Sequence, residues 1–257
     1  NPDSKEQEYA RHIYSAGLQA RDLVDHMLAF SRRSERFYDT IDLTDPLQES
    51  IKMLGASLPK TIELHQNIDV SHPFIHGNAG QIGQVLMNLC VNSKDAIEDE
   101  HGVLEISMKD ADLSESEMTP FLSDKPTNPT DVAAPDIKLI GKDKIRLYVG
   151  KLARDQKYIK LGISDTGCGI SKQVAEHIFE PFYTTKSVNE GTGLGMSMVH
   201  GVMIEHGGAI FVESEIGKGT SFELFFPVTE KIGNFDTAEE AEQNTHGQGH
   251  ILVVEDQ

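Results

Sequence analysis

Three short segments rich in polar residues or glycine occur along this chain, and each adjoins a stretch with the pattern of a helix or a strand. The first, residues 84–96 (QVLMNLCVNSKDA), has apolar residues at helical spacing on one face and amide and carboxylate side chains on the other. The second, Asp165–Ile170, directly follows an alternating, strand-like run, and the third, Gly191–Gly195, directly precedes a helical run. Strands and helices intermixed in this way predict an α+β domain whose helices cover one face of a mixed sheet.

Apolar spacing predicts the elements of this domain, which extends from about residue 41 to residue 228. Asp45-Pro46 is expected to cap a short helix that ends before Pro59, and a longer helix is expected at residues 79–98. Strands are expected at residues 61–69, around Phe74, and at 103–109, 144–150, 158–164, 209–215 and 220–228, the last four as two hairpins. Residues 110–136 are acidic and rich in proline, which predicts an exposed loop within an insertion at 110–155.

The segments on either side of the domain have different patterns. From Tyr9 to Phe30 apolar residues recur at alternating steps of four and three, which predicts a bundle-type helix within residues 1–40; an ordinary amphipathic helix is the alternative. Residues 229–249 are acidic and contain glycine and glutamine, which predicts a linker, and residues 250–257 begin another apolar run. The start without methionine and this last run lead us to expect a piece of a longer protein.

Composition narrows the classes of function. The chain has 23 Lys and Arg residues against 41 Asp and Glu residues, and the resulting net charge of -18 argues against binding to nucleic acid and direct contact with anionic membranes. The two cysteines, Cys90 and Cys168, lie far apart, so neither a disulfide framework nor a zinc site is indicated. Because no apolar stretch approaches the ~20 residues of a spanning helix and no signal peptide is present, we expect a cytoplasmic location, with a membrane anchor in the parent protein left open.

The polar face of residues 84–96 carries Asn88, Asn92 and Asp95, spaced four and three residues apart. Magnesium prefers oxygen ligands and is commonly held by one or two protein oxygens together with phosphates and water. The face therefore suits a magnesium site, although an ordinary solvated helix face explains the same spacing.

The other two segments suit the two ends of an adenine nucleotide. Asp165 can accept a hydrogen bond from an exocyclic amino group, whereas a base with a carbonyl there would be repelled; a plain Asp-Gly turn is the alternative. The glycines at 191–195 precede a helix, where backbone N–H groups and the helix dipole can meet a polyphosphate. Lys186 can supply positive charge to that polyphosphate, with a solvated surface lysine as the alternative.

Together with residues 179–186 (FEPFYTTK), these segments resemble the N, G1, F and G2 boxes of the histidine-kinase ATP-binding domain. That domain belongs to the GHKL superfamily, which also includes DNA gyrase and a heat-shock chaperone. The resemblance covers about residues 41–228 and includes Gly219-Thr220 in the closing hairpin. It implies a two-layer α/β sandwich with a mixed sheet, the Bergerat ATP-binding fold, preceded by the bundle-type helix.

The resemblance also implies roles for single residues. Asn92 would hold Mg²⁺, Asp165 would read the adenine amino group, and Thr220 would support the edge of the base. Asn88 and Lys186 would act at the metal and the phosphates, as the catalytic residues. The remaining implied contacts to ATP come from the boxes themselves, beneath a short lid at 184–193: Asp95, Gly167, Gly169, Ile170, Gly193, Leu194 and Gly195.

Asn88 bears on the type of reaction. Hydrolytic relatives in the superfamily have a glutamate at the corresponding position, where it can activate water, whereas an amide is a poor general base. The resemblance therefore implies transfer of the ATP γ-phosphoryl group to a histidine, achieved mainly by positioning and electrostatics. A module that only senses or docks a nucleotide, and a GHKL-type ATP hydrolase, stay open as alternatives.

The flanking segments resemble further parts of a hybrid sensor histidine kinase. Residues 1–40 resemble the second helix of the dimerisation and phosphotransfer hairpin, which implies a homodimeric parent and a phosphoacceptor helix outside this sequence. None of His12, His26, His200 and His206 lies in the setting of the acceptor histidine. Residues 250–257 resemble the first strand of a receiver domain, with an unrelated tail as the alternative.

Overall fold

The computed structural model describes residues 38–97, 101–121, 136–140, 143–186 and 191–230. The helix predicted between Tyr9 and Phe30 and the receiver strand predicted at 250–257 lie outside these residues, as does nearly all of the predicted linker. Among the described residues, no helix is long and apolar enough to cross a membrane.

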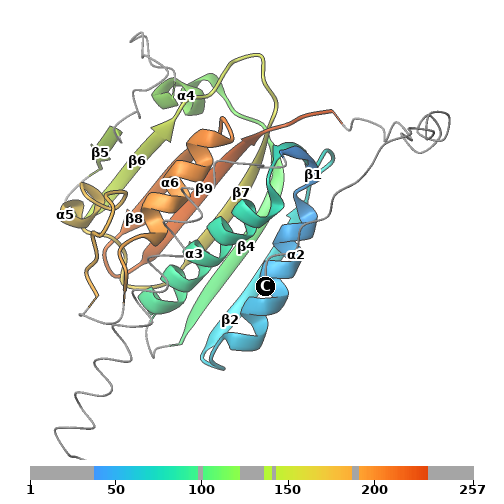
Figure 1. Cartoon of the computed structure of the whole chain (residues 1–257). Coiled ribbons are helices and arrows are strands. Elements are labelled where there is room, and N and C mark those ends of the chain that lie inside the picture. Colours follow the sequence, from blue (N-terminus) through green and yellow to red (C-terminus); the bar gives the residue numbers. More distant parts are fainter. Residues whose placement is uncertain (1–37, 98–100, 122–135, 141–142, 187–190, 231–257) are drawn as a thin grey trace, which may run out of the picture.

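A mixed sheet of seven strands forms the framework of the domain (Figure 1). Its order is β2-β4-β7-β9-β8-β6-β5; β2 and β4 pair in parallel and the other neighbours are antiparallel. The strands are β2 (Ile62–Asp69), β4 (Gly102–Ala111), β5 (Asp136–Leu139), β6 (Lys144–Gly150), β7 (Tyr158–Asp165), β8 (Ala209–Glu215) and β9 (Gly219–Pro227). A separate antiparallel pair, β1 (Asp39–Asp42) with β3 (Phe74–Gly77), completes the strands of the described residues.

Three helices pack side by side on one face of the sheet: α2 (Thr44–Ser57), α3 (Ala79–Ile97) and α6 (Gly195–Glu205) (Figure 1). Their apolar sides meet alternate residues of the strands, and the resulting core has fully buried side chains such as Leu47, Leu89 and Val199 from the helices and Leu161 and Leu224 from the strands. The α+β sandwich with helices on one face of a mixed sheet is thus confirmed. A single turn, α5 (Lys172–Ala175), follows β7.

The opposite face of the sheet carries a second, smaller apolar cluster. The short helix α4 (Glu115–Met118) and the 3-10 turn η1 (Thr119–Phe121) bring Met118 and Phe121 onto this face. Phe121 lies edge-on to Phe225 of β9 at 5.8 Å and to Tyr148 of β6 at 5.4 Å between ring centroids. Residues 110–121 are therefore not a loop throughout: the acidic side chains are exposed as predicted, but a short helix and a 3-10 turn bury Met118 and Phe121 against the sheet. Residues 122–135 of the predicted loop lie outside the described residues.

Two further predictions about local structure are wrong. The runs at 144–150 and 158–164 do not form a hairpin: β6 pairs with β8 and β5, whereas β7 pairs with β4 and β9. The β8–β9 hairpin, which was predicted, lies between them and supplies both with a partner. The α2 helix begins at Thr44 without a cap from Asp45; instead Asp42 Oδ1 accepts hydrogen bonds from Thr44 N (2.9 Å) and Thr44 Oγ1 (2.6 Å).

Candidate functional site

The C-terminal half of α3 lies beside the start of α6, which brings the first and third polar segments together. Asn88 Nδ2 donates to the carbonyl oxygen of Gly195 at 3.4 Å and contacts Met198 Sδ at 3.5 Å. A Cβ atom on Gly195 would lie 3.4 Å from Asn88 Oδ1, so the two helices approach closely at this point. The sequence places these residues 107 positions apart, and the packing of α3 against α6 on the sheet joins them.

Asp165, the last residue of β7, is a buried carboxylate with one oxygen already engaged. Its exposed fraction is 8%, and Oδ1 accepts the backbone N–H groups of Gly167 (2.9 Å) and Thr220 (3.2 Å). Burial raises the pKa of Asp165, and these two hydrogen bonds only partly offset that effect. No described residue donates to Oδ2 in normal geometry, so this oxygen is available to a ligand's hydrogen-bond donor.

The loop after Asp165 is fixed between α3 and the β8–β9 turn. Cys168 N donates to Ala96 O of α3 at 2.9 Å, and Gly217 N donates to Cys168 O at 2.8 Å. Gly169 has a φ of +75°, and a Cβ there would lie 2.4 Å from Glu215 O. A Cβ on Gly167 would lie 2.6 Å from the backbone of Ala96. Close approach of protein backbone therefore accounts for both glycines, in addition to any role in lining a base.

Residues 179–186 (the F-box segment) and residues 191–195 (the glycine segment) are joined by a backbone hydrogen bond. Phe182 N donates to Gly193 O at 2.9 Å, and both residues have left-handed backbone conformations, with φ of 68° and 67°. A Cβ on Gly193 would lie 2.4 Å from the carbonyl carbon of Phe182, so only glycine fits there. Leu194 follows directly before α6. This pairing sets the position from which α6 begins.

Lys186 ends the described part of the F-box segment and points to α3. Its Nζ lies 2.5 Å from Asp95 Oδ2, and each side chain is 32% exposed. Lys94 lies farther from the same carboxylate, at 3.8 Å from Oδ1. The lysine expected at the phosphates is thus beside the polar face of α3, paired with one of the residues predicted to contact ATP.

Asn92 lies one helical turn after Asn88 and is half-buried. Among the described residues its side chain makes no hydrogen bond, so its amide oxygen is available to a metal. No group of three or more His, Cys, Asp or Glu side chains able to hold a metal occurs in the described part of the chain. A magnesium ion here could be held by the Asn92 amide oxygen together with oxygens of the ligand itself.

Two buried serines in this region were missed from the sequence. Ser93 is 2% exposed and lies near enough to Asp165 to lower the pKa of that carboxyl, and its hydroxyl forms no hydrogen bond with another described residue. Ser214 is also 2% exposed and bonds to Ile170 N, Gly219 O and Thr220 Oγ1. Ser214 could have been found, because it occupies an inward position of β8 after Ile210 and Val212, where a polar residue is unusual.

The structure thus brings the predicted residues to one end of the helical layer. Asn88 meets Gly195, Asp95 meets Lys186, and Asp165 meets Thr220, while the loop with Gly167 and Gly169 packs on the last turns of α3. Ile170 is tied to β8 through Ser214. These contacts show that the four segments are neighbours in space.

Residues 133–230 match the model of the family described as histidine kinase-, DNA gyrase B-, and HSP90-like ATPase. The chain is 34% identical over 249 residues to the sensor kinase CckA of Brucella abortus, covering 93% of this chain and 23% of the relative. It is 25% identical over 207 residues to the sensor histidine kinase ZraS of Escherichia coli K12, covering 80% of this chain and 34% of the relative. The chain therefore spans about a quarter to a third of the length of these curated relatives.

Solved structures agree with the fold. Full-length ShkA in complex with AMPPNP superposes with a TM-score of 0.55 at 19% identity, over 89% of this chain and 40% of that one. The histidine kinase AdeS of Acinetobacter baumannii gives a TM-score of 0.50 at 17% identity, over 89% of this chain and 87% of that one. With the family match, these likenesses establish the Bergerat-like fold. Residues 133–230 are thus similar to the family of histidine kinase-, DNA gyrase B- and HSP90-like ATPases, and most of the chain is similar to part of two sensor kinases.

Proposed function

We propose that this chain binds Mg–ATP between α3, the loop after β7 and the start of α6, and transfers the γ-phosphoryl group to a histidine on a phosphoacceptor helix. The single observation that best supports this is the gathering of the four boxes around the C-terminal half of α3. Three side-chain groups would contact Mg–ATP. Asp165 Oδ2 would accept a hydrogen bond from the base, the amide oxygen of Asn92 would bind the metal, and the Lys186 ammonium would supply positive charge to the phosphates.

The protein groups divide between the two ends of the nucleotide. Asp165 and Thr220, with Gly167, Gly169 and Ile170, would form the base end, and Asn88, Asn92 and Lys186, with Asp95, would form the phosphate end. Gly193, Leu194 and Gly195 would present backbone at the start of α6, where the helix dipole favours negative charge. Magnesium, when held by Asn92, would neutralise charge on the phosphates.

The hydrogen bonds and the amide chemistry of Asn88 favour phosphoryl transfer over hydrolysis of ATP. Its Nδ2 is committed to Gly195 and Met198, and its amide cannot take a proton from water at neutral pH. Catalysis would then rest on holding the phosphoryl group near a nucleophile supplied by another helix. A hydrolase would need a general base, and neither Asn88 nor its described neighbours at the phosphate end, Asn92 and the Lys186-paired Asp95, is placed as one.

We further propose the arrangement of the parent protein. Residues 1–40 would supply the second helix of a dimerisation and phosphotransfer hairpin, residues 229–249 a linker, and residues 250–257 the first strand of a receiver domain. The support is the heptad pattern, the acidic composition and the terminal apolar run, together with alignment of 93% of this chain to a sensor kinase. The parent would then be a homodimeric hybrid sensor kinase acting in the cytoplasm.

The first test measures ATP affinity with and without magnesium. Replacing Asn92 with Ala should weaken binding about tenfold or more in Mg²⁺, because a metal ligand is lost, and should change it little in EDTA. Asn67→Ala, on the exposed outer face of β2, is the matched control and should leave both affinities unchanged. Equal loss in Mg²⁺ and EDTA would show that Asn92 does not hold the metal.

The second test identifies the reaction. The chain is mixed with radiolabelled ATP and a separately supplied phosphoacceptor helix from a sensor kinase, and label on histidine and free phosphate are both followed. Label on histidine supports the proposal. Steady phosphate release without labelling would indicate a hydrolase, and binding without either product in the full-length parent would indicate a nucleotide-sensing module.

A further inference from the structure

The Ser214 hydroxyl joins three segments at the base end of the site. It accepts the N–H of Ile170 at 2.8 Å, lies 3.0 Å from the carbonyl oxygen of Gly219 and lies 3.0 Å from Thr220 Oγ1. Thr220 in turn donates its backbone N–H to Asp165 Oδ1. Ser214 and Thr220 are 2% and 5% exposed, so water does not compete for these bonds.

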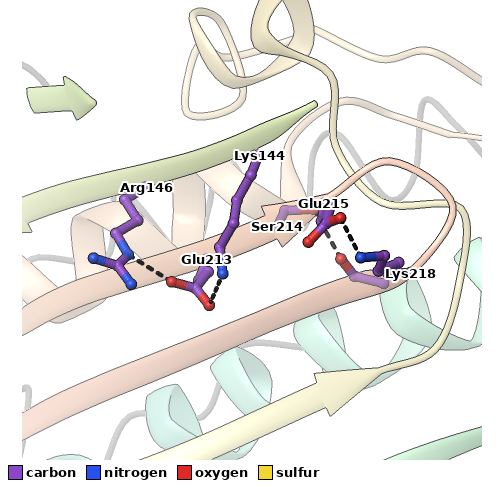
Figure 2. A network of polar contacts seen from close by, with 7 residues as sticks. Lys144, Arg146, Glu213, Ser214, Glu215 and Lys218 are labelled. Atoms are coloured by element: carbon purple, nitrogen blue, oxygen red, sulfur yellow. Dashed lines mark hydrogen bonds and ion pairs between the residues drawn. The ribbon is translucent and has the colours of Figure 1, made fainter. Parts of the chain in front are cut away.

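Ser214 faces the helix-covered side of the sheet because the side chain of the preceding residue, Glu213, is held on the opposite side. Glu213 points to Lys144 and Arg146 of the adjacent strand β6, at 2.7 Å and 2.5 Å, and Glu215 points to Lys218 across the turn (Figure 2). Burial alone would raise the pKa of Glu213, but its hydrogen bonds from Lys144 and Arg146 outweigh that and lower it. The charged Glu213 therefore fixes the end of β8, and alternation along the strand directs Ser214 to the helix-covered face.

One arrangement of protons satisfies all three contacts of Ser214. A serine hydroxyl has one proton to donate and two lone pairs to accept. The carbonyl of Gly219 can only accept, so the Ser214 proton is used there, and the N–H of Ile170 takes one lone pair. The contact with Thr220 then requires the Thr220 hydroxyl to donate to Ser214. Thr220 Oγ1 is left with lone pairs alone for any ligand.

Asp165 provides a second hydrogen-bond acceptor next to Thr220 Oγ1. Thr220 is the register partner of Asp165, so the two side chains lie on one face of neighbouring strands. Oδ1 of Asp165 is used by two backbone N–H groups, which leaves Oδ2 as an acceptor. The base end therefore offers two acceptors side by side.

We propose that Ser214 is a positioning residue that locks the Thr220 hydroxyl as an acceptor and so makes the site select bases with an exocyclic amino group. This rests on the proposed function, since it concerns how the same nucleotide is chosen. An amino group can donate two hydrogen bonds to the two acceptors, whereas a base with a carbonyl at that position meets like polarity. Without Ser214, the Thr220 hydroxyl is released to rotate and donate to a carbonyl.

The experiment compares the dissociation constants of ATP and inosine triphosphate for the full chain. The two nucleotides differ at the exocyclic position, where inosine has a carbonyl. Wild type should prefer ATP by about tenfold or more. Ser214→Ala should reduce that ratio severalfold toward unity, and should reduce it no further when combined with Thr220→Val, because Ser214 acts through Thr220. Ser221→Ala removes a hydroxyl from the next position of β9 and should leave the ratio unchanged.

The ratio separates selectivity from general damage. Loss of the bonds to Ile170 and Gly219 weakens both nucleotides alike, so it does not move the ratio. If Ser214→Ala does not fold, Thr220→Val and Thr220→Ser decide: the valine variant should lose the preference and the serine variant should keep it. A preference that persists in Ser214→Ala, or equal ratios in the two Thr220 variants, would overturn the inference. Failure of wild type to bind ATP would instead overturn the proposed function.

Discussion

At the scale of single residues, the buried charge of Asp165 is expected to lower the stability of the folded protein but to strengthen nucleotide binding. Burial raises the pKa of Asp165 above its ordinary value of 3.8, so the folded protein takes up a proton there more readily than the unfolded chain does. The stability linked to that proton is fully present below pH 3.8 and is lost as pH rises through the folded-state pKa. At neutral pH the folded protein therefore carries the cost of a buried charge.

Replacing Asp165 with Asn should raise the unfolding temperature at pH 7, because an amide oxygen can still accept the N–H groups of Gly167 and Thr220 without the charge. The same change should weaken ATP binding about tenfold, since a charge-assisted hydrogen bond is lost. Thermal unfolding from pH 4 to pH 8 and titration with ATP measure both effects. If the unfolding temperatures of Asp165→Asn and wild type are equal at every pH, burial of the carboxylate carries no cost.

At the scale of elements, the start of α6 depends on a backbone geometry that only glycine provides. Replacing Gly193 with Ala forces a Cβ to 2.4 Å from Phe182 and strains a φ of +67°. We expect the F-box segment to separate from the glycine segment and ATP affinity to fall at least tenfold, with far smaller changes in the helical content measured by circular dichroism.

Gly201 offers the matched control within the same helix. It is exposed, and a Cβ there would meet no atom within 4 Å. Replacing Gly201 with Ala should stabilise the protein by up to about 1 kcal/mol through helix propensity and leave ATP affinity unchanged. If Gly193→Ala and Gly201→Ala lose the same ATP affinity, the loss does not come from the backbone geometry at Gly193.

Local patterns in the sequence were enough to predict the elements but not all of their partners. The α3 helix and the β8–β9 hairpin have strong periodicity and a short turn, and both were predicted correctly. The pairing of β6 with β8 depends on which strands share a core, which no local pattern encodes. The site divides in the same way: helical spacing places Asn88 and Asp95 on one face, but the pairing of Asp95 with Lys186 joins positions 91 apart.

At the scale of the whole molecule, the sheet separates two apolar clusters, of which only one lies on the side of the candidate site. The larger cluster lies under α2, α3 and α6 and supports the candidate site, whereas the smaller one lies under α4 and η1 on the opposite face. Strand β9 contributes to both, with Phe225 in the smaller cluster and Thr220 at the site. These positions are five residues apart, or roughly 17 Å along a strand.

Replacing Phe121 with Ala should therefore change stability without changing the site. Its ring is 4% exposed and contacts Phe225 and Tyr148, so truncation leaves a cavity that should cost about 3 kcal/mol in the free energy of unfolding. Met53→Ala, at an exposed position of α2, should cost less than about 0.5 kcal/mol. Because the sheet and the helical layer between Phe121 and the site stay packed, ATP affinity measured on folded protein should stay within about twofold of wild type for both variants. Denaturant unfolding and ATP titration of the same samples test this, and a Phe121→Ala protein of normal stability but weakened affinity would show that the insertion acts on the site rather than on the fold.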